Sequence, residues 1–313
     1  MADGRASGDR TLAAAGMILI YAGIIGFTDN FVRVIASDAG LWQFHATRTV
    51  MAIGLLLILS RPLHLRLGAK NPKAVLARSA IHGLAMVIYF GALAFLPVAL
   101  VAAGLFTSPI FVLLIERFVY GSHIGPFRIL AVFLGFAGVI LVLGPEVMQG
   151  ASLPALLPVL AGVLYAMGNI ATRRWCPQES AETLLAGFFL ALGIAGAIGM
   201  LVLTLVPLPV PDGTAGFLMR GPLWPNEGFW IWTFVQAAGS LLGVGLMVRA
   251  YQVADATRVS VFEYAILPAS AAWSWVIWGE VLTPLAVAGM AMIVSAGIMI
   301  ALRAKDRRMA QPT

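Results

Sequence analysis

Charged residues are scarce in this chain of 313 residues. Asp, Glu, Lys and Arg together make up 11% of it, whereas apolar residues make up 60%. Soluble domains carry about 25% charged residues, so the chain lacks the charge that a hydrated surface of this length requires. Its apolar residues form long runs, which fit lipid as a solvent. The composition excludes a soluble globular domain and indicates an integral protein of a lipid bilayer.

Cysteine is almost absent as well, because Cys176 is the only one. A single cysteine excludes an intramolecular disulfide framework. The four histidines, His45, His64, His82 and His123, are scattered and form no cluster with the spacing of metal ligands. The sequence therefore predicts no metal site and no other cofactor.

The motifs of ATP-driven transport and of catalysis are also missing. The chain has no phosphate-binding glycine-rich loop with a lysine, and no hydrophilic segment long enough to form an ATP-hydrolysing domain. The acids inside its apolar runs are few and dispersed, so they form no catalytic constellation. The first apolar run, from Leu12 past Phe27, exceeds the 7–15 residues or so of a signal peptide. We expect that run to stay in the protein as a membrane span.

The apolar runs are long enough for ten membrane spans, since a helix needs about 20 residues to cross the hydrocarbon core. They lie near residues 12–34, 42–60, 76–96, 98–117, 126–144, 154–173, 183–206, 229–249, 257–278 and 283–302. Several connections are very short, such as Leu96-Pro97, and short connections make successive helices antiparallel neighbours. The sequence thus predicts an all-α integral membrane protein with ten transmembrane helices.

The basic residues gather on one side of these spans. If the N-terminus is cytoplasmic, 17 of the 20 Lys and Arg residues lie on the cytoplasmic side, as the positive-inside rule requires. Arg33 and Arg220 then lie outside, and Arg48 lies within the second span. The net charge of +6 follows from this topology and needs no nucleic acid partner. We expect a multi-pass protein of a bacterial-type inner membrane, with both termini cytoplasmic.

The longest outer connection covers residues 207–228 and is rich in proline, with Trp224, Trp230 and Trp232 near its end. Tryptophan is enriched where a helix meets the membrane surface. Two interpretations stay open: a loop followed by an interfacial aromatic anchor, or a loop that gates or collects substrate.

An internal repeat relates the two halves of the chain. Pro109 in the fourth span is followed by a glycine 12 residues later and by a proline 5 residues after that. Pro268 in the ninth span is followed in the same way after 11 and 5 residues. A weaker match links Asn30 in the first span with Asn169 in the sixth. These spacings indicate that each half contains the same series of helices.

We therefore predict two five-helix halves, residues 1–150 (helices 1–5) and residues 151–313 (helices 6–10). Because five is odd, the second half enters the membrane from the opposite side, which makes the repeat inverted. Inverted repeats recur in transporters. One half can take the conformation that its partner has just left, and this exchange opens a central site to alternate sides.

Short motifs in both halves carry a resemblance to a known family. They are Phe95-Leu96-Pro97-Val98-Ala99 through Pro109, Tyr120-Gly121, Ala250-Tyr251-Gln252-Val253-Ala254, Val261-Phe262-Glu263-Tyr264 and Trp278-Gly279-Glu280. With these motifs and Arg48, nearly the whole chain resembles the EamA-type members of the drug/metabolite transporter superfamily. The resemblance implies ten helices in inverted repeats, a central cavity, and substrates among amino acids, cofactors and other metabolites. The first half departs from the family pattern, because Gly121 is followed by Ser122 where a Glu is common.

Glu263 is the first candidate for a binding residue. A charged group at the centre of a span costs about 2.5–3.5 kcal/mol, so it usually faces a cavity or a partner. Glu263 lies five residues before Pro268, where a kink would free backbone carbonyls. It binds a cationic or amine group or a coupling proton, or else it is structural and pairs with Arg249 or Arg258.

Arg48 is a second charged candidate, about two turns from the outer end of its span. It attracts a carboxylate or phosphate of the substrate, extends its side chain to the interface, or pairs with Asp29 or Asp38. Asp29 and its neighbour Asn30 form a polar break in the first span.

Uncharged polar residues complete the candidate site. Tyr165 shares a helix face with Asn169, four residues on. His82, Met86 and Tyr89 also share one face, and so do Gln236 and Ser240. Each of these either contacts a substrate or packs between helices, and Trp273 is deep enough to do either. The predicted substrate-binding residues are Glu263, Asn30, Asn169, Tyr165, Tyr89, Gln236, His82, Trp273 and Arg48.

The leading hypothesis is a secondary transporter rather than an enzyme. It would move a small metabolite, either an amino acid or a related amine-bearing or zwitterionic compound, across the inner membrane by alternating access. Energy would come from a proton or substrate gradient. The alternatives are an intramembrane enzyme and a passive channel.

Overall fold

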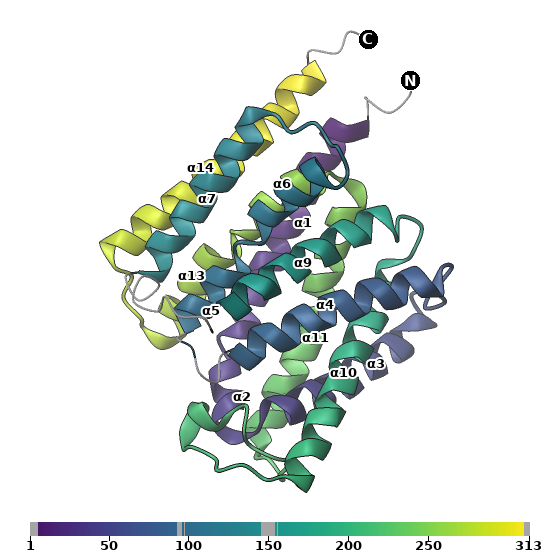
Figure 1. Cartoon of the computed structure of the whole chain (residues 1–313), viewed down its shortest axis with the longest axis vertical. Coiled ribbons are helices and arrows are strands. Elements are labelled where there is room, and N and C mark those ends of the chain that lie inside the picture. Colours follow the sequence, from purple (N-terminus) through teal and green to yellow (C-terminus); the bar gives the residue numbers. More distant parts are fainter. Residues whose placement is uncertain (1–5, 93–95, 97, 145–153, 155, 310–313) are drawn as a thin grey trace.

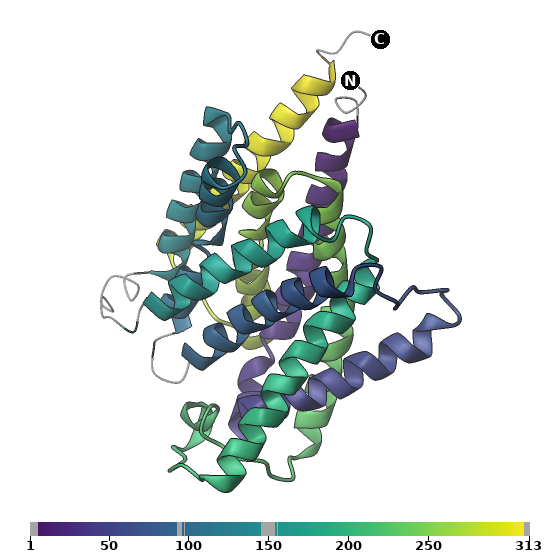
Figure 2. The same cartoon turned by 45° about the vertical axis from the view of Figure 1, so that its right-hand side comes forward.

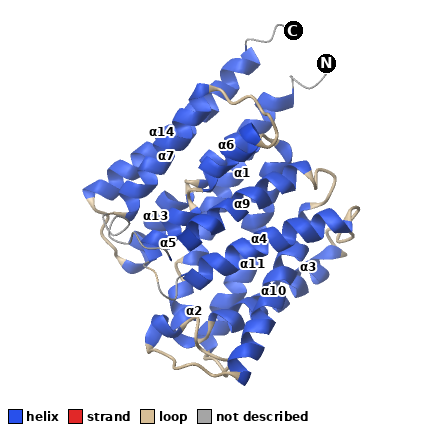
Figure 3. Cartoon of the chain, viewed as in Figure 1, coloured by secondary structure: helices blue, strands red, loops and turns tan. Residues whose placement is uncertain are grey.

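The computed structural model describes residues 6–92, 96, 98–144, 154 and 156–309, and these residues form a helical bundle without strands (Figure 3). The helices of the first half are α1 (Ala6–Asp29), α2 (Val32–Asp38), α3 (Leu41–Ser60), α4 (Pro72–Ala92), α5 (Val98–Leu105), α6 (Ser108–Phe118) and α7 (Pro126–Leu143). The all-α prediction is confirmed.

The second half continues with a similar series. Its helices are α9 (Leu156–Arg174), α10 (Ala181–Leu205), the 3-10 turn η2 (Gly213–Gly216), α11 (Glu227–Val253), α12 (Ala256–Glu263), α13 (Ile266–Trp278) and α14 (Pro284–Met309). The start of α1 and the end of α14 lie at the same end of the bundle (Figure 1). We call that end, with the loop at residues 119–125, the terminal face. The opposite end, with α2 and the loop at residues 206–226, is the far face.

Nine segments of the described residues are long and apolar enough to cross a membrane. The ninth predicted span, 257–278, is not among these segments, because α12 and α13 divide it at Tyr264 and Ala265. Pro268 lies in the first turn of α13, where its missing N–H is not needed for a helical hydrogen bond. The sequence predicted a kink at this proline, whereas the structure starts a new helix just before it.

Two other predicted spans are divided in the same way. The fourth breaks at Phe106 and Thr107, between α5 and α6, and Pro109 lies in the first turn of α6. The first breaks at Asn30 and Phe31, between α1 and α2, where a polar break was predicted. The remaining ends agree with the prediction to within a few residues. The links at Pro97 and Pro145, and the predicted boundary of the halves at residues 150 and 151, lie outside the described residues.

Helices of the two halves contact each other in matched pairs. The contact of α1 with α11 matches that of α9 with α4. The contact of α1 with α13 matches those of α9 with α5 and α6, and the contact of α3 with α11 matches that of α10 with α4. The pairs α3–α10 and α7–α14 join equivalent helices, and α7 and α14 lie side by side along one edge (Figures 1 and 2). Exchanging the two series of helices therefore turns each of these contacts into another of them. The packing of α1 on α14 is an exception, because α7 does not pack on α9 to the same extent.

The outer helices present apolar side chains outward. Only 28% of the apolar window of α10 is buried inside the bundle, and Ile194, Ile198 and Leu201 are all more than half exposed. Helices satisfy their own backbone hydrogen bonds, so an apolar outer surface of this kind fits lipid.

The loop at the far face is bound to α2 and α3. Arg220 donates through Nη1 to the carbonyl oxygens of Ala36 at 2.9 Å and Ala39 at 3.1 Å. Gln43 and Leu223 exchange two hydrogen bonds, of 2.7 and 3.1 Å. These contacts hold the loop over the far end of the bundle.

Trp224, near the end of this loop, and Trp232, in α11, have different surroundings. Trp224 is 89% exposed, as an interfacial anchor would be. Trp232 instead stacks on Phe31, with ring centroids 3.3 Å apart and planes 8° from parallel.

Arg78 is one of the basic residues counted on the cytoplasmic side, near the start of the third predicted span. The structure buries it in α4, where Nε donates to Thr172 Oγ1 at 2.9 Å and Nη1 donates to the carbonyl of Leu184 at 3.2 Å. These two hydrogen bonds link α4 to α9 and α10.

Candidate functional site

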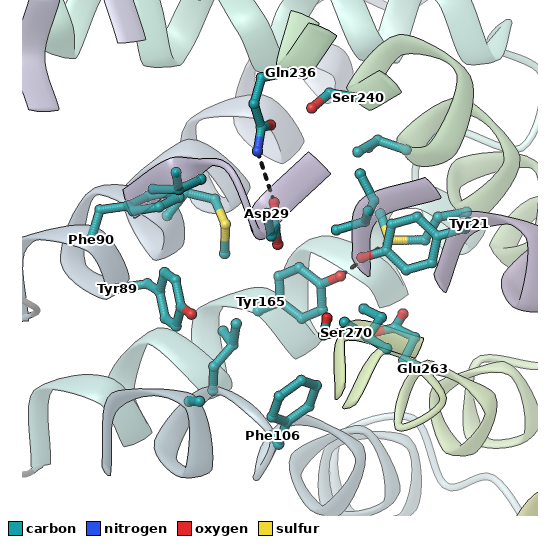
Figure 4. Close-up of a pocket in the computed structure, with 18 of the residues that line it drawn as sticks. Tyr21, Asp29, Tyr89, Phe90, Phe106, Tyr165, Gln236, Ser240, Glu263 and Ser270 are labelled. Atoms are coloured by element: carbon teal, nitrogen blue, oxygen red, sulfur yellow. Dashed lines mark hydrogen bonds between the residues drawn. The ribbon is translucent and has the colours of Figure 1, made fainter. Parts of the chain in front are cut away.

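A cavity of about 610 Å³ lies at the centre of the bundle and has lining residues from both halves (Figure 4). Small-molecule sites have volumes of about 300–1,000 Å³. The lining extends to Arg33 and Ala36 on α2 and to Phe217 and Leu218 of the far-face loop. The side chain of Arg33 is 43% exposed, so the cavity reaches the surface of the far face.

Much of the cavity wall is aromatic. The rings that line it belong to Tyr21, Tyr89, Phe90, Phe106, Tyr165, Phe188 and Phe217. Tyr165 contacts His82 edge to face, with centroids 4.7 Å apart, and His82 contacts Phe188 in the same way at 5.4 Å. The Tyr165 hydroxyl donates to Met247 Sδ at 3.1 Å. This wall offers ring faces and edges to a planar ligand.

Asp29 lines the cavity at the end of α1, where the first span breaks. Gln236 of α11 donates to its Oδ1 at 3.0 Å (Figure 4). Arg48 lines the same cavity from α3, and its guanidinium carbon lies 5.0 Å from the centroid of Phe44. Asp38, another partner proposed for Arg48, instead accepts from the backbone N–H of Asn226 at 2.8 Å.

Glu263 is the last residue of α12, at the break of the ninth span, and is 4% exposed. Asn169 Nδ2 donates to its Oε1 at 3.3 Å. The arginines proposed as structural partners bind elsewhere. Arg258 lies 3.5 Å from Asp255, and Arg249 donates to Gln252 at 3.4 Å. The carboxylate of Glu263 therefore lines the cavity with an amide as its hydrogen-bond donor.

Six of the nine predicted site residues line the cavity. They are Glu263, Tyr165, Tyr89, Gln236, His82 and Arg48. The shared helix face predicted for His82, Met86 and Tyr89 is the face that α4 turns to the cavity, and Ser240 joins Gln236 there.

The other three, Asn30, Asn169 and Trp273, are not among the lining residues. Asn30 Nδ2 donates to the carbonyls of Gly26 at 2.7 Å and Ser270 at 3.2 Å, and Trp273 Nε1 donates to the carbonyl of Gly23 at 3.0 Å. Both side chains join α1 to α13.

Asn169 is fully buried behind Glu263. Sequence spacing shows which residues share a helix face. It does not show which way that face points, and this is why the three assignments to the cavity wall differ from the structure.

Several lining residues were not predicted, among them Tyr21, Phe90, Phe106, Ser108 and Ser270. A signal for one of them was present. Tyr21 and Asp29 are eight residues apart on α1, with Ile25 between them, and this spacing places all three on one face.

Buried polar atoms of the wall lack partners within the described part of the chain. They are Arg48 Nε, His82 Nδ1, Ser108 Oγ and Gln236 Oε1. An unpaired buried polar atom costs about 1–3 kcal/mol. Leaving these four atoms without a partner therefore destabilises this conformation of the cavity wall.

A separate polar hollow of about 270 Å³ lies at the terminal face, between Glu116, Arg128, Arg174 and Asp255. Asp255 lies 3.6 Å from Arg128, 3.3 Å from Arg173 and 3.5 Å from Arg258. These ion pairs join α7, α9 and α12. No group of three or more potential metal ligands occurs among the residues that the structure describes.

A bundle of membrane-length helices around a central cavity with aromatic walls and a few charged groups is typical of a polytopic membrane transporter. Residues 12–144 match the EamA-like transporter family. This match, over the first half of the chain, confirms the resemblance to drug/metabolite transporters.

Named relatives agree with this class. The chain is 27% identical over 287 residues to a riboflavin transporter from Rhizobium johnstonii, covering 88% of this chain and 84% of the relative. It is 28% identical over 296 residues to a pseudopaline exporter from Pseudomonas aeruginosa, covering 92% and 96%. The matching family and both relatives are transporters, which indicates a membrane transporter rather than an enzyme.

A protein of known crystal structure shares the fold. It has a TM-score of 0.73 at 20% identity, with 96% of this chain and 99% of that chain covered. The similarity therefore extends over all the helices of both halves.

Proposed function

We propose that this protein is a secondary transporter of a small amine-bearing or zwitterionic metabolite. The observation that carries the proposal is the presence of opposite charges in one aromatic cavity. Asp29 and Glu263 supply carboxylates that would bind the amine, and Arg48 supplies a guanidinium that would bind a carboxylate. Charge-assisted hydrogen bonds of this kind are about twice as strong as neutral ones.

Alternating access is the mechanism that the fold supports best. The matched helix contacts support two inverted halves, residues 1–150 and 151–313, that exchange conformations. The cavity extends to the far face, while the ion pairs of Asp255 lie across the terminal face. The arginine-rich terminal face is cytoplasmic in this proposal, as the positive-inside rule requires for an inner-membrane protein.

Proton coupling follows from the surroundings of Glu263. A buried carboxylate is costly unless a cation or a proton neutralises it. In the proposed cycle Glu263 binds the substrate amine in one step and a proton in the return step, so the two compete for one group. A proton gradient would then drive the transport.

A planar heterocycle is the second candidate substrate, because aromatic rings form much of the cavity wall. One relative is named for riboflavin and another for pseudopaline. The names of the relatives therefore support more than one substrate class, and the charged groups decide our preference for an amine or a zwitterion.

The test is counterflow in proteoliposomes loaded with single amino acids, polyamines or riboflavin. We expect saturable exchange of an amine-bearing or zwitterionic compound. Glu263→Gln and Arg48→Gln should each abolish most of it, while Glu227→Gln and Arg117→Gln, which change exposed charges outside the cavity, should retain it. Exchange of riboflavin alone would favour the second candidate. Unsaturable flux without exchange would show a channel and overturn the carrier proposal.

A further inference from the structure

An arginine at the end of α9 is held in a cluster at the terminal face. Arg174 donates through Nε and Nη2 to the two carboxylate oxygens of Glu116, at 3.0 and 2.6 Å. Ser122 Oγ donates to the same carboxylate at 2.6 Å. The guanidinium carbon lies 3.9 Å from the ring centroid of Tyr120. We call Arg174, Glu116, Ser122 and Tyr120 the terminal cluster.

A second cluster, again of an arginine, a glutamate, a serine and an aromatic residue, lies at the far face. Arg33 of α2 donates through Nη1 to Glu280 Oε1 at 2.9 Å, and Ser274 donates to the other carboxylate oxygen. The guanidinium carbon of Arg33 lies 3.9 Å from the ring centroid of Trp278. We call Arg33, Glu280, Ser274 and Trp278 the far cluster.

The internal repeat relates the two clusters. The aromatic residue of each directly precedes Gly121 or Gly279, and these glycines have φ angles of +65° and +69°. In both halves this left-handed glycine turns the chain so that the next residue reaches the cluster. That residue is Ser122 at the terminal face and Glu280 at the far face.

The acid and the serine thus exchange places between the halves. The first half has its Glu on the helix and its Ser after the glycine, and the second half has the reverse. This exchange explains why Ser122 departs from the family pattern, since Glu116 supplies the carboxylate there. Two arrangements that form the same contacts from exchanged positions indicate a requirement for the contacts themselves.

The clusters differ in burial. The side chain of Glu116 is 8% exposed and binds both donor nitrogens of its arginine, whereas the side chains of Arg33 and Glu280 are 43% and 54% exposed and share one ion-pair contact. Arg33 also lines the cavity where it reaches the far face. The side chain of Arg174 is 35% exposed, so the clusters differ mainly in the burial of their carboxylates. The two-bond cluster with the buried carboxylate lies at the closed face, and the one-bond cluster with the exposed carboxylate lies at the open face.

We propose that the two clusters are paired latches that position α9 on α6 and α2 on the α13–α14 turn. The terminal cluster holds the terminal face closed in this conformation. The far cluster becomes buried and forms its second hydrogen bond when the far face closes. Arg174, Glu116, Arg33 and Glu280 are positioning residues in this scheme, which rests on the alternating access proposed above.

The test measures access to the cavity from each face. Ala102 lines the cavity, so Ala102→Cys is labelled with a membrane-impermeant maleimide in whole cells and in inside-out vesicles. Cys176 serves as the background thiol because it is buried, and burial raises its pKa. The rate of labelling from the terminal face reports how often that face opens.

The two latches should change this rate in opposite directions. Glu116→Gln weakens the closed terminal face, so labelling from that face should rise about tenfold, as expected for a buried hydrogen bond to a charged group. Glu280→Gln weakens the closed far face, so the same labelling should fall about threefold. Arg117→Gln and Glu227→Gln are the matched controls and should change neither rate, since both side chains are exposed outside the clusters.

The exchanged positions provide a rescue experiment. Glu116→Ser should raise labelling from the terminal face, and adding Ser122→Glu should restore the original rate, because the double variant has the arrangement of the far cluster. A fold that merely needed Glu116 for stability would not recover in this way. The thermal stability of each purified variant is measured alongside.

Changes in the same direction for Glu116→Gln and Glu280→Gln, or no change in either, would overturn the latch proposal. The proposed function fails separately. If Ala102→Cys in otherwise unchanged protein is labelled from one face only, even with substrate and gradient supplied, alternating access itself is wrong. Labelling from both faces with no effect of the variants leaves alternating access standing and removes only the latches.

Discussion

The two divided spans that contain Pro109 and Pro268 differ at equivalent positions. Five residues before the proline, α5 has Gly104 and α12 has Glu263. A Cβ on Gly104 would lie 2.7 Å from the backbone carbon of Pro158, so this position packs against α9. Glu263 instead lies on the cavity wall and hydrogen-bonds Asn169. The same kind of helix break thus serves helix packing in the first half and, in the proposed function, ligand binding in the second.

The largest effect on stability should come from filling the packed position. We expect Gly104→Leu to destabilise the protein by about 3 kcal/mol, because backbone atoms of α9 cannot move aside as a flexible side chain would. The measurement is thermal or denaturant unfolding in detergent. Gly54→Leu is the matched control, since nothing lies within 4 Å of a Cβ built at Gly54. Equal losses in the two variants would contradict the packing role of Gly104.

The next largest effect should come from Glu263, and it should fall on binding rather than on stability. Glu263→Gln keeps the shape but removes the charge, so we expect substrate affinity to fall by about 2 kcal/mol, or roughly thirtyfold. Ligand-induced thermal stabilisation measures this, because stabilisation grows with ligand concentration over its dissociation constant. A full ligand response in Glu263→Gln would move the amine site to Asp29.

The repeat relates Asn30 to Asn169, and these two asparagines should also differ in whether they affect stability or ligand affinity. Asn30→Ala removes two hydrogen bonds between α1 and α13 and should lower stability by about 1–2 kcal/mol with little change in affinity. Asn169→Ala removes the donor to Glu263 and should change affinity more than stability. Unfolding and ligand titration of both variants give the comparison. A reversed pattern would show that Asn30, not Asn169, acts on the ligand.

The smallest effect should appear at Glu280, outside the spans. Hydrogen bonds from Ser274 and from the Arg33 guanidinium hold the pKa of Glu280 below its ordinary value. A lowered pKa in the folded state stabilises the protein above the ordinary Glu pKa of about 4.3, and this stabilisation is lost as pH falls through the folded pKa. Ser274→Ala should shift that loss to higher pH, by less than about 1 kcal/mol because the pair is exposed. Unfolding curves from pH 7 to pH 3 measure it, and superimposable curves would remove Ser274 from the far cluster.

The sequence predicted which types of polar residue form the site, but only partly where each of them lies. A costly charge in an apolar run, such as Arg48 or Glu263, is visible in the sequence because few other residues there are charged. Asp29 lies at the end of its apolar run, next to Asn30, and could therefore be placed only at a break. Asn30 and Trp273 show the converse, because polar side chains deep in a span also bind neighbouring backbone carbonyls.

The sequence by itself determined that the chain spans a membrane many times as helices, and roughly where each span begins and ends. The physical reason is local: a run of about 20 apolar residues must satisfy its backbone hydrogen bonds within itself when surrounded by lipid. Only the tertiary structure decided which face of each helix turns inward, where three spans break, and which charges meet. Those features depend on contacts between residues far apart in the chain, such as Arg174 with Glu116 and Arg33 with Glu280.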